Sequence, residues 1–454
     1  MKGTYTAKKQ LAQVPLGWLE KTFVAGLVAI TAYIPFHAIF SVSFGVFTHQ
    51  PLLVKAAKEL VLLVLVIMGV VILFKYKSLA TVYIRSRINQ IAAAFVALHL
   101  LLAIWLHSNL GATLGGLDID IRFAVFFLAV RLAMLLTTRT RTYMIKAFVI
   151  GSAVVIAFGV LQQYLLPKDI LSHIGYGQNT IEPYLTVDKN TDFIRINSTL
   201  RGPNSLGAYL VVVIAVIAGY LATYWRRLSR SVLIACVLGI LAGISVMYAS
   251  YSRSAWIAVA LAAVVFGVIG LPRKKQLVIV AIAAVLTVTG VVGYELGKDS
   301  QFVRTVIDHK DPKNPSQTTS SNADHLKSVT ESAKRALGQP FGAGIGSTGA
   351  ASYFGESKII IEDQYLSTAH EAGWLGLILL VAFQGGVLAM LYQSRRDWFA
   401  KAIFASGLGL VLVALTLPIF TDDTVAYVWW GLAAVGATIL ETKKYGKQTK
   451  QKTA

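Results

Sequence analysis

The sequence predicts an all-α polytopic membrane protein, with about twelve transmembrane helices and two long external loops. Its 454 residues are 56% hydrophobic and only 14% charged, and the mean hydropathy of +0.63 is too high for a water-soluble chain of this size. Apolar stretches of roughly 20 residues recur, which is the length that a helix needs to cross a hydrocarbon core about 30 Å thick. Strands of a membrane barrel would give shorter, alternating segments. We therefore expect one helical membrane domain over residues 1–454.

The predicted spans are the apolar runs between clusters of lysine and arginine. In chain order they cover residues 23–45, 52–74, 88–107, 122–138, 144–166, 203–224, 231–250, 254–271, 276–295, 362–392, 400–418 and 424–441. The first residues are basic and lead into a full-length apolar span without a small-residue cleavage site, so we expect the first helix to be retained.

The distribution of positive charge predicts the orientation of the chain. If the amino terminus is cytoplasmic, the basic loops "RTRTYMIK", "WRRLSR", "PRKKQ" and "SRRDWFAK" all lie inside, whereas the short opposite loops contain no lysine or arginine. Cytoplasmic loops of membrane proteins are enriched in these two residues. We expect both termini to be cytoplasmic, with residues 442–454 as a basic tail. The net charge of +20 is then a topology signal, and no nucleic acid partner is expected.

Two predicted external loops, residues 167–202 and 295–361, are long enough to need a function of their own. In the larger one, residues 323–337 read as a short amphipathic helix that lies along the membrane or caps a cavity. The glycines of "GAGIGS" that follow, Gly344 among them, permit close backbone turns. Gly344 either contacts substrate or belongs to a hinge or turn.

Charges at the outer ends of spans are candidates for function, because charge is expensive at the edge of hydrocarbon. Arg195 and Arg201 precede the span that begins at Pro203, and Arg253 in "SYSRSAWIA" starts a second span that also enters from outside. Free backbone amides and the helix dipole favour anions at such helix starts. Together the arginines predict a site for a pyrophosphate or another polyanion. The alternative is that each guanidinium only anchors a helix end at the interface.

Acidic residues precede two further inward-running spans. Glu362 and Asp363 start the tenth span, where they are either helix-start charges or, for Glu362, a general base for a sugar hydroxyl. His370, about two turns further on, is a proton relay or a buried histidine bonded to a neighbour. Asp422 and Asp423 start the last span and read as helix-start charges on the same outer face.

In order and spacing, these clusters resemble the O-antigen ligase and polymerase superfamily of bacterial envelope glycosyltransferases. That family has an arginine that opens a stretch ending in Pro-Asn before a helix, as Arg195 does with Pro203 and Asn204 here. A later Ser-Arg-small-aromatic pattern matches "SRSAW", which contains Arg253. A "Pro-x-x-Gly-x-Gly" turn in a large external loop is similar to "QPFGAGIGS", and a following His-Asn or Glu-Asn pair resembles the start of "EDQYLSTAHEAGWLG". There, Glu371 and Gly373 fall where the family has Glu and Gly.

The resemblance implies a multi-pass protein of the bacterial cytoplasmic (inner) membrane that uses a polyprenyl-pyrophosphate-linked glycan as donor. The acceptor would be a hydroxyl of a glycan, a lipid or a protein. Arg195 and Arg253 would bind the pyrophosphate and Glu362 would accept the acceptor proton, with Arg201, Asn204, Asp363, His370 and Gly344 as further substrate contacts. Direct displacement would invert the anomeric centre. Beyond these substrates and membrane lipids, no cofactor and no metal is expected, because arginines and helix starts can carry the leaving-group charge.

Histidine often stands in ligases of this family where this chain has Glu362, and asparagine where it has Asp363. Three reactions therefore stay open within the superfamily: O-antigen ligation, polymerisation of O-antigen or exopolysaccharide, and protein O-oligosaccharyl transfer. A polytopic transporter or flippase is the alternative from another class. For a transporter we would expect charge pairs near mid-bilayer and internal repeats.

Overall fold

The structure, a computed structural model, describes residues 16–106, 109–308, 321–355 and 358–453. The basic amino-terminal segment and residues 309–320 of the larger predicted loop lie outside these ranges. The first half of the chain forms α2 (Trp18–Tyr33), η1 (Ile34–Phe36), α3 (His37–Thr48), α4 (Pro51–Lys75), α5 (Lys77–Ile84), α6 (Arg87–Trp105), α7 (Leu110–Leu136), α8 (Arg139–Tyr164), η2 (Ile170–Ile174), β1 (Leu185–Val187) and β2 (Asn190–Arg195).

The second half is also almost entirely helical. It forms α9 (Pro203–Tyr224), α10 (Arg230–Ala249), α11 (Arg253–Val268), α12 (Arg273–Gly297), η3 (Val303–Ile307), α13 (Ser321–Gly338), η4 (Gly349–Phe354), α14 (Gln364–Gln393), α15 (Trp398–Ala414), η5 (Ile419–Thr421) and α16 (Asp423–Thr453). α13 occupies the position of the amphipathic helix predicted in the larger loop, and α16 continues through most of the predicted tail.

The predicted fold class, an all-α polytopic membrane protein, is confirmed. Within the described residues, nine helical segments are long and apolar enough to cross a membrane, and α11 and α15 are shorter apolar helices. Each of the twelve predicted runs falls on one of these segments or on α7. α7 begins at Leu110, twelve residues before the predicted span, so residues 110–121, which the prediction leaves between two spans, are helical. Asp118, Asp120 and Arg122 therefore lie inside this helix.

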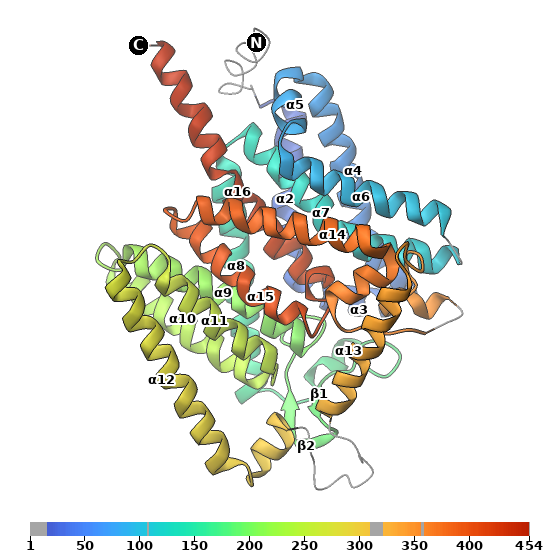
Figure 1. The fold of residues 1–454 in the computed structure, drawn as a ribbon, viewed down its shortest axis with the longest axis vertical. Helices are drawn as coiled ribbons and strands as arrows, with labels where there is room; N and C mark the ends of the chain where they lie inside the picture. Colours follow the sequence, from blue (N-terminus) through green and yellow to red (C-terminus); the bar gives the residue numbers. More distant parts are fainter. Residues whose placement is uncertain (1–15, 107–108, 309–320, 356–357, 454) are drawn as a thin grey trace.

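Helices are buried to very different extents (Figure 1). α16 lies at the centre of the bundle with most of its apolar segment buried, whereas α12 buries none of its residues. Stacked and edge-to-face aromatic rings join α7, α14 and α16 there, through Phe123, Phe127, Phe383 and Trp430. The centre is thus fixed by large, rigid side chains.

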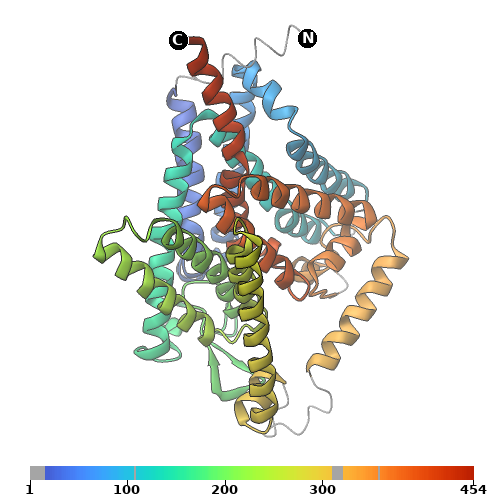
Figure 2. The same cartoon turned by 60° about the vertical axis from the view of Figure 1, so that its left-hand side comes forward.

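The smaller predicted loop contains an antiparallel hairpin that the sequence reading did not anticipate. β1 pairs with β2, and Leu185 lies opposite Arg195. The two residues between the strands, Asp188 and Lys189, both have positive φ, at 49° and 63°, the conformation that joins strands through a two-residue turn. The hairpin and α13 lie toward one end of the molecule, and the carboxyl end of α16 lies at the other (Figures 1 and 2). We call these the hairpin end and the terminal end.

Candidate functional site

The starts of α9, α14 and α16 are joined by side-chain hydrogen bonds at the hairpin end. Ser205 in the first turn of α9 donates its hydroxyl to Asp422 Oδ2 at 2.6 Å, just before α16. Thr421 donates to Gln364 Oε1 at 3.4 Å, which links the same segment to the first residue of α14. Because helix starts have unpaired amides and a positive dipole end, this cluster favours negative charge.

Arg195 is held beside this cluster by contacts to two helices. It is the last residue of β2, and its Nε donates to the Ser250 carbonyl oxygen at 2.9 Å, at the end of α10. Its Nη2 donates to Asn204 Oδ1 at 2.7 Å, in the first turn of α9. A backbone bond of 3.2 Å from Ile196 N to the Ala249 carbonyl fixes the strand end. The structure thus brings Arg195 and Asn204, two predicted site residues, into direct contact.

Arg195 is a cation whose protein contacts are uncharged oxygens. Burial and, to a smaller extent, the nearby charge of Arg253 lower the pKa of Arg195 from its usual 12.5 to about 10, while Asp188 acts in the opposite direction. The guanidinium therefore stays protonated at neutral pH, although its charge is partly desolvated. An anion bound here would relieve both effects.

Arg253 is the first residue of α11, and its guanidinium connects that helix to the larger loop. Its Nη1 donates to the carbonyl oxygen of Ile307 in η3. Because Arg195 bonds to Ser250, three residues before Arg253, the two arginines converge on one region of the hairpin end, where the charge of Arg253 also influences Arg195. Two helices that both start at this end predict such a pair of arginines, and the hairpin places Arg195 close to Arg253.

A group of aromatic rings lies next to Arg253. Tyr248 stacks on Trp256 with an interplanar angle of 10° and on Phe302 with one of 16°. The centroids are 5.5 and 6.2 Å apart, respectively. Phe193 of β2 meets Phe302 edge-on. These rings join α10, α11, the hairpin and the larger loop, so they fix the positions of both arginines.

Arg201 is placed differently from the other two arginines. Its side chain is exposed and lies near Asp422. Burial raises the pKa of the Asp422 carboxyl above its usual range, although the hydrogen bond from Ser205 and the charge of Arg201 act in the opposite direction. Arg201 therefore compensates an acidic residue at this end, and contributes less free positive charge than Arg195.

Glu362 and Asp363, which are adjacent in sequence, have different surroundings. Asp363 is buried and caps α14, because its Oδ1 accepts from the amides of Tyr365 at 2.8 Å and Leu366 at 2.7 Å. Glu362 is exposed at the hairpin end. The capping interaction explains Asp363 in structural terms, and it leaves Glu362 as the accessible carboxylate of the pair.

Gly344 lies in a tight interlock between the larger loop and α14. It has a φ of +101°, and a Cβ at this position would collide with the Leu106 carbonyl oxygen. α14 is broken at Gly373, whose φ is +69°. The freed carbonyls of His370 and Glu371 accept from Ala343 N at 2.7 Å and Gly344 N at 3.2 Å instead. In the structure, Gly344 therefore has the contacts of a turn, which is one of its two predicted roles.

His370 and Glu371 face the interior of this interlock. Glu371 is buried, and its Oε1 accepts from the Thr348 amide at 2.9 Å. His370 is 1% exposed, and neither of its ring nitrogens has a hydrogen-bond partner among the described residues. The Glu and Gly of the family pattern therefore coincide with a carboxylate that anchors the loop and with the break in α14.

Residues 239–381 match the sequence model of one family, Wzy_C, described as O-Antigen ligase. We call this segment the O-antigen ligase domain. The predicted resemblance to that superfamily is thereby confirmed over these residues. No curated protein matches the chain. Arg253, Gly344, Glu362, Asp363 and His370 lie within the O-antigen ligase domain, whereas Arg195, Arg201 and Asn204 precede it. Arg195 contacts the domain at Ser250 and bonds to Asn204.

A second polar cluster lies at the hairpin end, outside the O-antigen ligase domain, and sequence reasoning missed most of it. Arg122 of α7 forms ion pairs with Asp423, with Glu59 at 3.6 Å and with Asp118 at 3.7 Å. Lys58 of α4 pairs with Glu59 at 2.7 Å and with Asp423 at 3.6 Å. We call these five residues the Arg122 cluster. The available signal was the spacing of Asp118 and Arg122, four residues apart on what proves to be one helix face.

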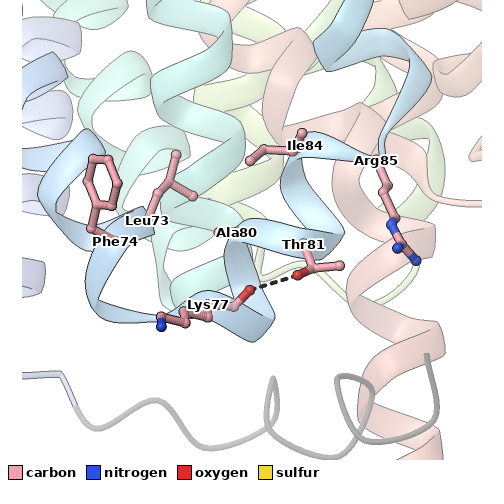
Figure 3. A pocket seen from close by; sticks show the side chains of 7 residues that line it. All are labelled: Leu73, Phe74, Lys77, Ala80, Thr81, Ile84 and Arg85. Atoms are coloured by element: carbon pink, nitrogen blue, oxygen red, sulfur yellow. Dashed lines mark hydrogen bonds between the residues drawn. The ribbon is translucent and has the colours of Figure 1, made fainter. Parts of the chain in front are cut away.

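Two cavities lie at the terminal end, away from the arginines of the O-antigen ligase domain and its neighbouring strand. One, of about 430 Å³, is bounded by the end of α4 and by α5 (Figure 3). It is lined by Leu73, Phe74, Lys77, Ala80, Thr81, Ile84 and Arg85. The Thr81 hydroxyl is turned to the Lys77 carbonyl at 2.9 Å. The other cavity lies between α2 and α8.

Proposed function

We propose that the protein transfers a glycan from a polyprenyl-pyrophosphate carrier to an acceptor hydroxyl at the outer face of the bacterial cytoplasmic membrane. The match to the O-antigen ligase family supports a glycan-processing function at a membrane. The observation that carries the specific proposal is the convergence of Arg195 and Arg253 at the end of the bundle where α9 and α11 start. In this orientation the hairpin end faces outward and both termini are cytoplasmic.

In the proposed reaction, the two arginines bind the pyrophosphate of the donor. The acceptor oxygen attacks the anomeric carbon as Glu362 takes its proton, and the bond from that carbon to the pyrophosphate oxygen breaks. The electron pair leaves with the polyprenyl pyrophosphate, where Arg195 and Arg253 stabilise the developing charge. Attack opposite the leaving group inverts the anomeric centre. The exposed position of Glu362 supports its access to a large acceptor.

Alanine variants of the arginines test the anion site. Arg195→Ala and Arg253→Ala should each lower the rate of glycan transfer by about 10²–10³-fold, which is the effect of removing one donor that stabilises transition-state charge. Membrane insertion and protein level should not change. Arg227→Ala, which removes an exposed arginine between α9 and α10 at the opposite end, is the control. Retained transfer in both test variants would refute the pyrophosphate site.

The base is tested by comparing the two neighbouring carboxylates. Glu362→Gln should abolish turnover while the variant still binds donor, because the amide cannot accept the proton. Asp363→Asn should keep the cap of α14, since asparagine is an equally good capping residue. Unchanged turnover of Glu362→Gln at neutral pH would remove Glu362 as the base.

The product formed by purified protein distinguishes the reactions of the superfamily. Mass spectrometry after incubation with a polyprenyl-pyrophosphate glycan and candidate acceptors should show new glycan linkages. A single new linkage indicates ligation to a lipid or protein acceptor, and a ladder of repeats indicates a polymerase. The absence of product with every acceptor would favour transport instead.

A further inference from the structure

The cavity between α2 and α8 is an apolar groove at the terminal end. It has a volume of about 650 Å³, and its walls include Ala25, Ala29 and Ala32 of α2 and Ala147 of α8. The three alanines of α2 are four and three residues apart, so they share one helix face. Because these side chains are small, the two helices pack side by side and still leave a groove between them.

Three cations line the same cavity. Lys21 is near the start of α2, Arg139 is the first residue of α8, and Lys146 follows two turns later. All three side chains are exposed. The amino-terminal end of α8 adds the positive end of its helix dipole. The groove therefore combines apolar walls with positive charge.

Acidic residues of α2 and of segments that pack against α2 and α8 are engaged by other cations. Glu20 pairs with Lys75 at 2.8 Å, and Asp397 pairs with Arg141 at 2.8 Å. Glu441 pairs with Arg131 at 2.8 Å. No ion pair with Lys21, Arg139 or Lys146 is found among the described residues. The positive charges of Lys21, Arg139 and Lys146 are therefore available to an anionic ligand.

The dimensions and charge of the groove match one class of ligand. From Lys21 to Ala32 the helix rises about 16 Å, which accommodates an acyl chain along the alanines with its headgroup at the cations. Basic sites between transmembrane helices on the cytoplasmic side bind anionic headgroups. We propose that this groove binds an anionic phospholipid of the leaflet at the terminal end. This site is separate from the glycan-transfer reaction.

Lipid binding to the purified full-length protein tests the proposal. Native mass spectrometry in detergent, with equal phosphatidylglycerol and phosphatidylcholine, should show preferential retention of phosphatidylglycerol by the wild type. The variant Lys21→Gln/Arg139→Gln/Lys146→Gln should lose about 100-fold in apparent affinity, because each basic residue near an anionic headgroup contributes about fivefold. Ala29→Phe keeps all the charges but fills the groove, and it should also weaken binding.

A matched variant controls for the loss of charge at this face. Arg227→Gln/Arg230→Gln/Lys274→Gln removes three exposed cations elsewhere at the terminal end and should bind phosphatidylglycerol as the wild type does. Equal binding by the groove variant and the wild type would overturn the proposal. So would equal retention of phosphatidylcholine, or binding of soluble glycerol phosphate as tight as that of phosphatidylglycerol, since the site would then take a free anion.

Discussion

Arg122 and Arg195 both lie at the hairpin end, but they have opposite electrostatic surroundings. Arg122 is 6% exposed and lies among three carboxylates, those of Asp423, Glu59 and Asp118. Arg195 is half-buried and contacts a carbonyl oxygen and an amide oxygen. Arg122 is therefore compensated within the protein, whereas Arg195 keeps its charge.

This difference separates a structural arginine from a candidate ligand-binding one. A buried ion-pair network holds α4, α7 and α16 in register and has no need of a ligand. An arginine that is oriented by uncharged oxygens is positioned as firmly, yet it still attracts an anion. Intramembrane charge alone does not reveal function, so the identity of the contacting atoms has to be known.

The largest effect is expected from breaking the compensated cluster. Arg122→Met leaves the carboxylates of Asp423 and Glu59 close together with Lys58 as their shared cation, and removing one partner of a buried pair costs about 3–5 kcal/mol. Thermal unfolding of the purified protein should show this loss of stability. Asp423→Asn in the same chain should restore part of it. Arg201→Met, at an exposed arginine of the same end, should change stability by less than about 0.5 kcal/mol.

If Arg122→Met were as stable as the wild type, the Arg122 cluster would not stabilise the fold. Arg122 and Arg195 would then not differ in the way proposed.

A change of cation at Arg195 should shift the pH dependence of transfer. The pKa of Arg195 is lowered to about 10, so its charge, and with it donor binding, is present below that pH and lost above it. Lysine starts roughly two units below arginine and meets the same burial and the same neighbouring charge. Arg195→Lys should therefore lose transfer activity at a pH about two units lower than the wild type.

The measurement is the rate of transfer between pH 6 and 10, with Arg227→Lys as the control. A profile for Arg195→Lys that overlays that of the wild type would show that this charge does not serve the donor.

The smallest effect is expected where the two regions meet. Ser205 of α9 donates to Asp422, the neighbour of Asp423 in the Arg122 cluster. Ser205→Ala removes one hydrogen bond and should lower the free energy of unfolding by about 1 kcal/mol. Because α9 also bears Asn204, which orients Arg195, the apparent affinity for the donor should fall as well. A fall in stability with donor affinity unchanged would show that the two regions are independent.

The fold could be predicted in outline, because hydropathy acts locally along the chain. Each apolar run corresponds to a helix, and the amphipathic pattern of residues 323–337 corresponds to α13. The predicted span is shorter than α7 because Asp118 and Asp120 are typical of a loop. Arg122 pairs with Asp118 on the same helix, but its other partners, Glu59 of α4 and Asp423 of α16, are remote in sequence, so no local pattern could show the whole cluster.

Of the candidate site, the sequence predicts the charged residues but not the backbone that positions them. Arg195 and Arg253 stand out because each precedes an inward-running span, and their convergence follows from topology. The hairpin that carries Arg195 has no strong signal, since its turn uses Asp188 and Lys189 in place of the usual Asn-Gly. The packing of Gly344 was equally hidden, because it depends on the carbonyl of Leu106, just after α6, which is far away in sequence.

The break of α14 at Gly373 has a consequence for how substrates can reach the site. The carbonyls of His370 and Glu371 and the amide of Trp374 lack their partners within the helix and bond to the 340–344 segment instead. Lifting that segment would leave several buried backbone groups unpaired at once, each costing about 1–3 kcal/mol. We therefore expect this contact to stay closed during turnover, so that in the proposed reaction a lipid-linked donor would enter along a different side of the bundle.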